Sequence, residues 1–265
     1  MDELAIDELV IDDEHSFRHV ALYADLKEVL RRAKYRFRVL PAKGPPRWDR
    51  ALFLNLTFWG ARGGGDVLES DHLAADVVAH VAWHHLAASA FAGGAAGDSP
   101  PSADLLFLGE AIASAFDVYL VGRLLGHAPE SSFLETQVPA MADAADAAGL
   151  SEAGFEALLE DIARDPDLAF EDLRQLLTDA TRALTSCAGA DDALVALSSF
   201  DGHRFAALLH RYELSNWVLY ARAHASAALG PDPRVRAFDR ALRDEKSPLD
   251  WLASAWIAPA IGATT

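Results

Sequence analysis

Two histidines spaced four residues apart are the side chains of this chain best suited to bind a metal ion. They are His80 and His84, within the segment 76–85, which reads DVVAHVAWHH. Side chains four residues apart lie one turn from each other on the same face of an α-helix, so both imidazoles can reach one ion. A Zn²⁺ site needs at least a third ligand, and Glu110 offers a carboxylate in the next apolar segment. Two histidines and one carboxylate also suit Fe(II) in non-haem oxygen chemistry.

Two runs of the sequence resemble motifs of the gluzincin metallopeptidases, the thermolysin-like group. The run 76–84 is similar to the D-V-V-x-H-E-x-x-H helix of that family, and the run 109–114, GEAIAS, is similar to its N-E-A-I-S-D stretch. The resemblance covers roughly residues 50–125, with the two motifs in the family's order. It implies a zincin-like fold, in which a small sheet precedes two metal-bearing helices. It also implies that the two histidines and the glutamate are zinc ligands.

The chain departs from that family at the residue that performs the family's proton transfer. In gluzincins a glutamate follows the first histidine and acts as general base, whereas this chain has Val81, which cannot accept a proton. Losing a general base lowers a rate by about 10²- to 10⁴-fold. Asp76, one helical turn before the first histidine, is a candidate substitute base or a hydrogen-bond partner that orients a ligand imidazole. The family's aspartate after the glutamate is also replaced, by Ser114, although Asp117 lies two turns from the glutamate on a similar face. We therefore expect a relative of metallopeptidases with lost or altered hydrolase activity, a pseudoenzyme.

Histidines in the C-terminal half are weaker candidates for a catalytic role. In gluzincins a histidine or tyrosine from the helical half helps to stabilise the oxyanion. The resemblance suggests that one of several residues of this half has that role, with His210 and His224 as candidates beside His203, Tyr212 and Tyr220. The chain contains no G-x-S-x-G nucleophile motif and no phosphate-binding loop ending in Gly-Lys-Ser/Thr. Cys187, the single cysteine, is expected inside a helix as a buried residue rather than as a nucleophile.

The hydropathy pattern predicts the elements that would position these side chains. Helical spacing of apolar residues predicts helices over 15–34, 67–91 and 103–125. Alternation predicts two paired strands, over 35–39 and 52–58. The glycine run before residue 66 predicts a loop, with an aspartate at residue 66 capping the first metal-bearing helix. Beyond residue 129 the pattern predicts helices and no strand.

These elements favour an α+β fold that is mainly α. Residues 1–14 are expected to form an acidic N-terminal arm, either mobile or docked. Residues 15–128 are expected to form the zincin-like subdomain, and residues 129–265 an all-helical subdomain. Alanine, the best helix former, is abundant throughout.

The overall charge limits the partners of this protein. The 265 residues carry a formal net charge of −17 at pH 7, which opposes binding to nucleic acid or to an anionic membrane. One cysteine permits no internal disulfide, and the acidic N-terminus lacks the pattern of a secretory signal. The sequence also contains no apolar run that we expect to cross a bilayer. We expect a cytoplasmic protein with a peptide or protein partner, a basic one in the case of the acidic arm.

Three functions remain open at this stage. The first is a zincin-like metal-binding protein related to metallopeptidases, with zinc as its ion. The second is a non-catalytic helical protein with a binding or regulatory role. The third is a non-haem Fe(II) enzyme that uses two histidines and one carboxylate. The sequence does not set the oligomeric state.

Overall fold

The computed structural model describes residues 2–40, 64–92, 101–224 and 230–262. The chain divides into two compact units. Unit 1 comprises residues 1–92 and 250–265, and unit 2 comprises residues 93–249. The expected boundary near residue 128 therefore lies inside unit 2, and the last sixteen residues belong to unit 1 rather than to the helical half.

The described residues of unit 1 form two small sheets. Their strands are β1 (Asp2–Ala5), β2 (Val10–Asp12), β3 (Arg36–Val39), β4 (Gly64–Leu68) and β5 (His72–Ala74). In the first sheet, β3 lies between β1, to which it is antiparallel, and β4, to which it is parallel. The second sheet is the parallel pair of β2 and β5. Along β3, Phe37 and Val39 are buried while Arg36 and Arg38 are exposed, so one face of this strand covers the core.

The helices of unit 1 come from both ends of the chain. They are η1 (Ile6–Glu8), α1 (Glu14–Phe17), α2 (Ala21–Arg32), α4 (Ala75–Phe91), α12 (Pro248–Leu252), η3 (Ala253–Ile257) and α13 (Ala258–Ile261), of which η1 is a 3-10 helix and η3 a π-helix. α2 packs against α4, and both η3 and α13 pack against α2. The ring of Trp256 lies edge-on to Phe91, with centroids 6.4 Å apart. The C-terminal segment therefore completes the core that the first 92 residues begin.

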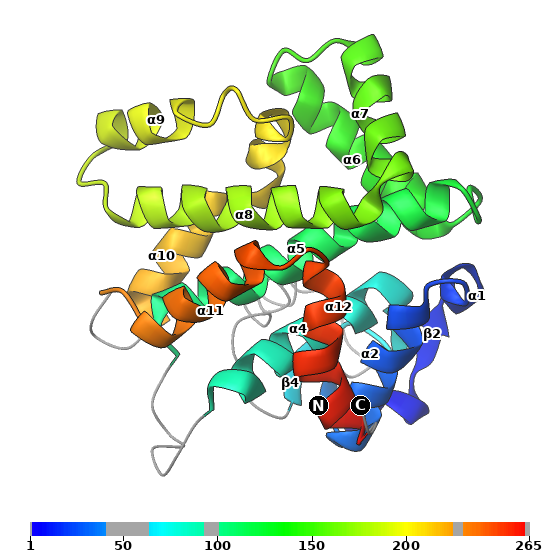
Figure 1. The fold of residues 1–265 in the computed structure, drawn as a ribbon. Coiled ribbons are helices and arrows are strands. Elements are labelled where there is room, and N and C mark those ends of the chain that lie inside the picture. The colour runs from blue at the N-terminus through cyan, green and yellow to red at the C-terminus, as the bar shows by residue number, and fades with distance from the viewer. Residues whose placement is uncertain (1, 41–63, 93–100, 225–229, 263–265) are drawn as a thin grey trace. The chain divides into compact units, whose positions relative to one another are not determined.

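Unit 2 consists of helices in the part of it that the structure describes. They are α5 (Ala103–Leu125), α6 (Ser132–Ala147), α7 (Glu152–Arg164), α8 (Pro166–Thr185), α9 (Ala190–Ser198), η2 (Ala206–Tyr212), α10 (Leu214–His224) and α11 (Pro233–Asp244). α5 packs along α8 and also contacts α6, α7, α10 and α11 (Figure 1). Its start is fixed by Ser102, whose hydroxyl accepts a hydrogen bond from the Leu105 amide at 3.2 Å.

A network of buried charges joins the helices of unit 2. The guanidinium of Arg174 is fully buried and donates two hydrogen bonds to the carboxylate of Glu171, at 2.6 and 2.7 Å. It donates a third to Asp239 on α11, at 2.7 Å. Asp239 also accepts hydrogen bonds from Arg182 at 2.6 Å and from Arg243 at 3.2 Å. The network ties α8 to α11 within the unit.

The predicted mainly helical α+β class is confirmed, and several predicted boundaries change. The helix over 103–125 is confirmed, and so is the strand within 35–39. The helix over 15–34 is broken between α1 and α2, where Val20 has extended backbone angles. The helix over 67–91 begins only at Ala75, because the preceding residues pair as β4 and β5. Asp66 accordingly lies in β4 and caps no helix. The second predicted strand, over 52–58, lies outside the described residues.

The acidic N-terminal segment is ordered into short elements in the structure. Residues 2–5 pair with β3, and residues 10–12 pair with β5. Of the two forms expected for residues 1–14, the docked one describes the part of the segment that the structure covers.

Candidate metal centre

The two histidines lie one turn apart on α4, as their spacing predicts. Their ring centroids are 5.0 Å apart and the ring planes are inclined by 46°. Both side chains are half-buried. The opposite faces of α4 hold buried residues such as Val78 and Trp83, which anchor the helix in the core. These buried residues fix the backbone of α4, while the two imidazoles lie at the edge of the core, partly accessible to solvent.

The carboxylate of the group comes from the apolar helix α5. Glu110 is only 5% exposed, and its neighbours along the helix, Leu108, Ala111 and Ile112, are fully buried. In such a low-dielectric environment a carboxylate interacts strongly with a nearby positive charge. Glu110 is therefore placed to contribute both a ligand oxygen and the negative charge that a divalent cation needs.

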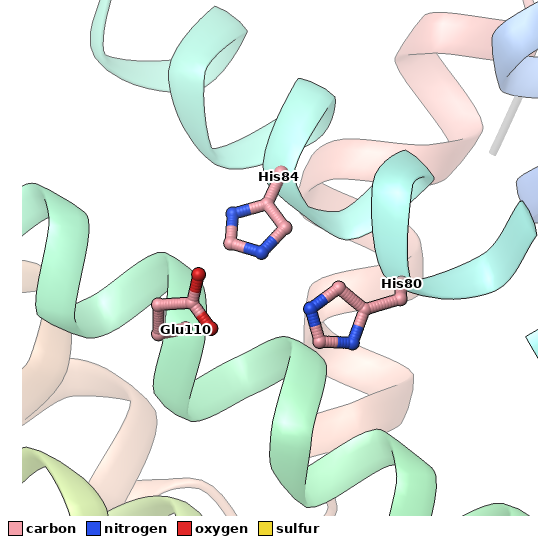
Figure 2. A group of neighbouring side chains, drawn as sticks. All are labelled: His80, His84 and Glu110. Carbon is pink, nitrogen blue, oxygen red and sulfur yellow. The ribbon is translucent and has the colours of Figure 1, made fainter. Parts of the chain in front are cut away.

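The three side chains are directed toward one another, as Figure 2 shows. His80, His84 and Glu110 each offer one ligand atom, and these three atoms all lie within 4.8 Å of one another. Two ligand atoms of one tetrahedral zinc ion are about 3.4 Å apart, because each bond measures about 2.0 to 2.2 Å. The three candidate ligand atoms, grouped within 4.8 Å, are nitrogen and oxygen donors of the kinds that zinc takes. The residues present therefore fit a small divalent cation.

The position of the missing general base is occupied by a packed aliphatic side chain. Val81 follows the first histidine and is 2% exposed, so its side chain is part of the core. Ser114 stands one turn after the glutamate on α5 and is also buried, while Asp117 is half-buried one turn further along. None of these three residues belongs to the group of ligand atoms described above.

Asp76 lies close enough to Tyr23 for its charge to act on that phenol. Its negative charge contributes to raising the pKa of Tyr23 on α2, an effect due first to burial of that phenol and second to the charge of Glu14. The Tyr23 hydroxyl donates a hydrogen bond of 3.1 Å to Glu14. Asp76 is not among the three grouped ligands. Its role as a substitute base or orienting partner stays a prediction.

The C-terminal candidates are only partly described. His210 lies in η2 and His224 ends α10, but both side chains fall outside the described part of the chain. Nearby, Nδ1 of His203 accepts a hydrogen bond from the Phe205 amide at 3.1 Å, and burial lowers the pKa of that imidazole. Tyr212 is buried, which raises its pKa to about 12, and the charge of Asp117 adds to the rise.

Two further histidines of unit 1 have defined surroundings. His72 on β5 contacts Asp12 on β2, with Nδ1 3.0 Å from the carboxylate, and this interaction raises the pKa of His72. His85 packs edge-on against the ring of Tyr35, and burial lowers the pKa of His85. His85 thus faces the aromatic core of unit 1 and is not among the grouped ligands, as its position about 100° around the helix from His84 predicts.

One helix of the described residues is long and apolar enough to cross a membrane by length and composition. The apolar stretch is an 18-residue window of α5; because Glu110 and Asp117 lie in this helix, it is not the uninterrupted apolar run that the sequence was expected to lack. However, 89% of that window is buried within the protein. The core helix of a globular protein has the same properties, so this helix is weak evidence for a membrane span.

Comparisons of the chain with protein-family models, with curated proteins and with solved structures found no match. The resemblance to gluzincins therefore rests on the two short motifs, and the candidate site rests on the arrangement of its own side chains.

Proposed function

We propose that this protein binds one divalent cation through His80, His84 and Glu110. We further propose that it is a zincin-like relative of the metallopeptidases that has lost their usual peptidase mechanism. The observation that supports metal binding is the grouping of the three ligand atoms within 4.8 Å. Two imidazole nitrogens and one carboxylate oxygen form a donor set found at zinc sites, and three protein ligands leave further positions around the ion for water or a ligand.

The second part of the proposal is supported by the side chain beside the first histidine. A peptidase of the gluzincin type needs a proton acceptor there, and Val81 offers none. Val81 is buried, and its aliphatic side chain carries no atom that accepts a proton. The proposed site accordingly retains its three ligands and has no proton acceptor at the position of the family's general base.

Metal analysis of the purified protein tests the binding. We expect about one zinc ion per chain in protein prepared without added metal, and at least a tenfold lower content in His84→Ala. A chelator should lower the melting temperature of the parent protein and leave that of His84→Ala unchanged, because an ion bound only to the native state stabilises it by mass action. His127→Ala, at an exposed histidine after the end of α5, is the matched control and should behave as the parent.

The outcomes separate the parts of the proposal. Equal metal content in the parent and His84→Ala would contradict the binding site. A parent protein without metal that melts at the same temperature as His84→Ala would contradict it as well. Iron in place of zinc, with oxygen-dependent absorbance, would favour the Fe(II) enzyme, whose donor set is the same. Casein or short peptides incubated with the zinc-loaded protein should show no chelator-sensitive hydrolysis. Sustained turnover would mean that another group serves as the base.

A further inference from the structure

Within the first 38 residues, an acidic segment near the N-terminus lies close to a basic segment that follows it in the sequence. We call residues 2–8 the acidic segment, because four of its seven residues are aspartate or glutamate. We call residues 31–38 the basic segment, because five of its eight residues are arginine or lysine. A basic cluster of this density is unusual in a chain with a net charge of −17. Both segments belong to unit 1.

The acidic segment lies directly on the basic one. β1 runs antiparallel to β3, with Glu3 opposite Arg38. The Glu3 carboxylate lies 3.9 Å from Nε of Arg38. The backbone carbonyl oxygen of Glu3 accepts a hydrogen bond of 3.3 Å from Arg36. Further along, Asp7 accepts a hydrogen bond of 2.6 Å from Arg31, and Glu8 lies 3.5 Å from Arg36. Each of these three carboxylates is thus paired with an arginine of the basic segment.

The first strand is held weakly compared with the residues that follow it. Its four residues are exposed or half-buried. The side chains of the ion pair between Glu3 of β1 and Arg38 are 60% and 49% exposed, and ion pairs in water contribute little individually. The next residues are anchored, since Ile6 is 2% and Leu9 9% exposed. β1 can therefore separate from β3 without removing these apolar anchors from the core.

Separation of β1 would expose the edge of β3, with its backbone hydrogen-bonding groups and flanking arginines. β3 pairs with β4 on its other side, so its backbone groups facing β1 are the ones that would lose a partner. Such an edge accepts another extended chain by backbone hydrogen bonding. Arg36 and Arg38 flank it on the exposed face and select carboxylates. A nucleic acid has the charge but lacks the amide donors and carbonyl acceptors of a strand, so the edge favours a polypeptide.

We propose that the β3 edge, with Arg36 and Arg38, is a docking site for an acidic extended segment of a partner protein. β1 is the built-in occupant that the partner displaces. The chain's own acidic segment shows the kind of sequence that the site accepts, namely a short strand with carboxylates opposite the arginines. This interaction is separate from the candidate metal centre and does not depend on it.

Displacement is tested with a peptide that copies the acidic segment. The probe is a fluorescent peptide of residues 1–8, MDELAIDE, added to the full-length protein. The variant Glu3→Lys/Asp7→Lys places like charges opposite Arg38 and Arg31 and should release β1. We expect it to bind the peptide at least tenfold more tightly than the parent, whose own strand competes. The control, Glu156→Lys/Glu160→Lys, alters net charge equally at exposed positions of α7 and should bind as the parent does.

Further changes to the protein and to the peptide test whether peptide binding depends on the arginines of β3 and on the acidic residues of the peptide. Adding Arg36→Gln/Arg38→Gln to the released variant should weaken binding at least tenfold, as should replacing the acids of the peptide by Asn and Gln. If circular dichroism shows that the released variant does not fold, Glu3→Gln/Asp7→Asn takes its place with the same expectation. Equal affinity for the released variant and its control would overturn the proposal. It would also be overturned by equal affinity for the neutral peptide, or by a released variant that exchanges strands into a dimer and excludes the peptide.

Discussion

Arg174 and Asp239 illustrate how single buried charges are stabilised in this protein. Burial alone would raise the pKa of Asp239, but the facing cations of Arg174, Arg182 and Arg243 outweigh burial and lower it to about 2. The positive charge of Arg174 is compensated by Glu171 and Asp239 together. Because every member has charged partners, removing one leaves an uncompensated charge in the core.

Replacing Asp239 by Asn should lower the free energy of unfolding at pH 7 by about 3–5 kcal/mol, the usual effect of breaking a buried ion pair. The carboxylate stabilises the fold only while it is ionised in the native state. Its contribution is therefore complete above its ordinary pKa of 3.8 and declines as the pH falls toward about 2. The difference between parent and variant should narrow by about 2 kcal/mol across that range.

Denaturant unfolding at a series of pH values measures this difference. Asp244→Asn, at an exposed position near the end of the same helix α11, is the control and should stay within about 0.5 kcal/mol of the parent. A gap between parent and Asp239→Asn that does not change below pH 3.8 would contradict the depressed pKa.

The sequence predicts helix boundaries that depend on local signals and misses those that depend on pairing with distant residues. The α5 helix was predictable at both ends, because Ser102 caps its start and Gly126 follows its last apolar residue. The start of α4 was not, because Val67 and Leu73 are held in strands by Arg38 on β3 and by Ile11 on β2, respectively. Such pairings join residues far apart in sequence and override local helical spacing.

The same distinction applies to the candidate site. Spacing alone predicted that His80 and His84 share a helix face, which the structure confirms. The resemblance suggested Glu110 as third ligand, yet only tertiary packing decides whether a residue 26 positions further along the chain meets them. Sequence reasoning also overlooked that the acidic segment has a basic partner within the chain. The density of basic residues in 31–38 is the signal that would have revealed it.

The close approach of α5 and α7 at Gly122 predicts that a larger residue there destabilises the fold. A Cβ atom added at Gly122 would lie 2.6 Å from the backbone oxygen of Ile162 and 3.0 Å from Cγ of Pro166. Gly122→Ala should therefore force α7 away from α5 and lower the free energy of unfolding by about 1–3 kcal/mol. Gly126→Ala, following the end of the same helix with no atom within 4 Å of the added Cβ, should change it by less than about 0.5 kcal/mol. Denaturant unfolding compares the two variants, and equal stabilities would contradict the close contact.

At the scale of the whole molecule, unit 1 is assembled from two separate parts of the chain. Residues 1–92 form most of it, and the chain returns at residue 250 after completing unit 2. The returning segment contributes buried side chains, among them Leu252, Trp256 and Ile257. Each unit thus has its own apolar core, which is the condition for two units to open separately.

Two tryptophan substitutions test whether the units open separately. Trp256 in unit 1 is 7% exposed and Trp217 in unit 2 is 8% exposed, so replacing either by Ala should cost about 3–5 kcal/mol in its own core. In Trp256→Ala, amide hydrogen exchange should accelerate in α2 and α4 while α5 and α8 keep their protection. Trp217→Ala should give the reverse pattern and so serves as the reciprocal control. If each variant instead accelerates exchange equally in both units, the 265 residues unfold as one cooperative body, and the C-terminal segment stabilises the entire chain rather than unit 1.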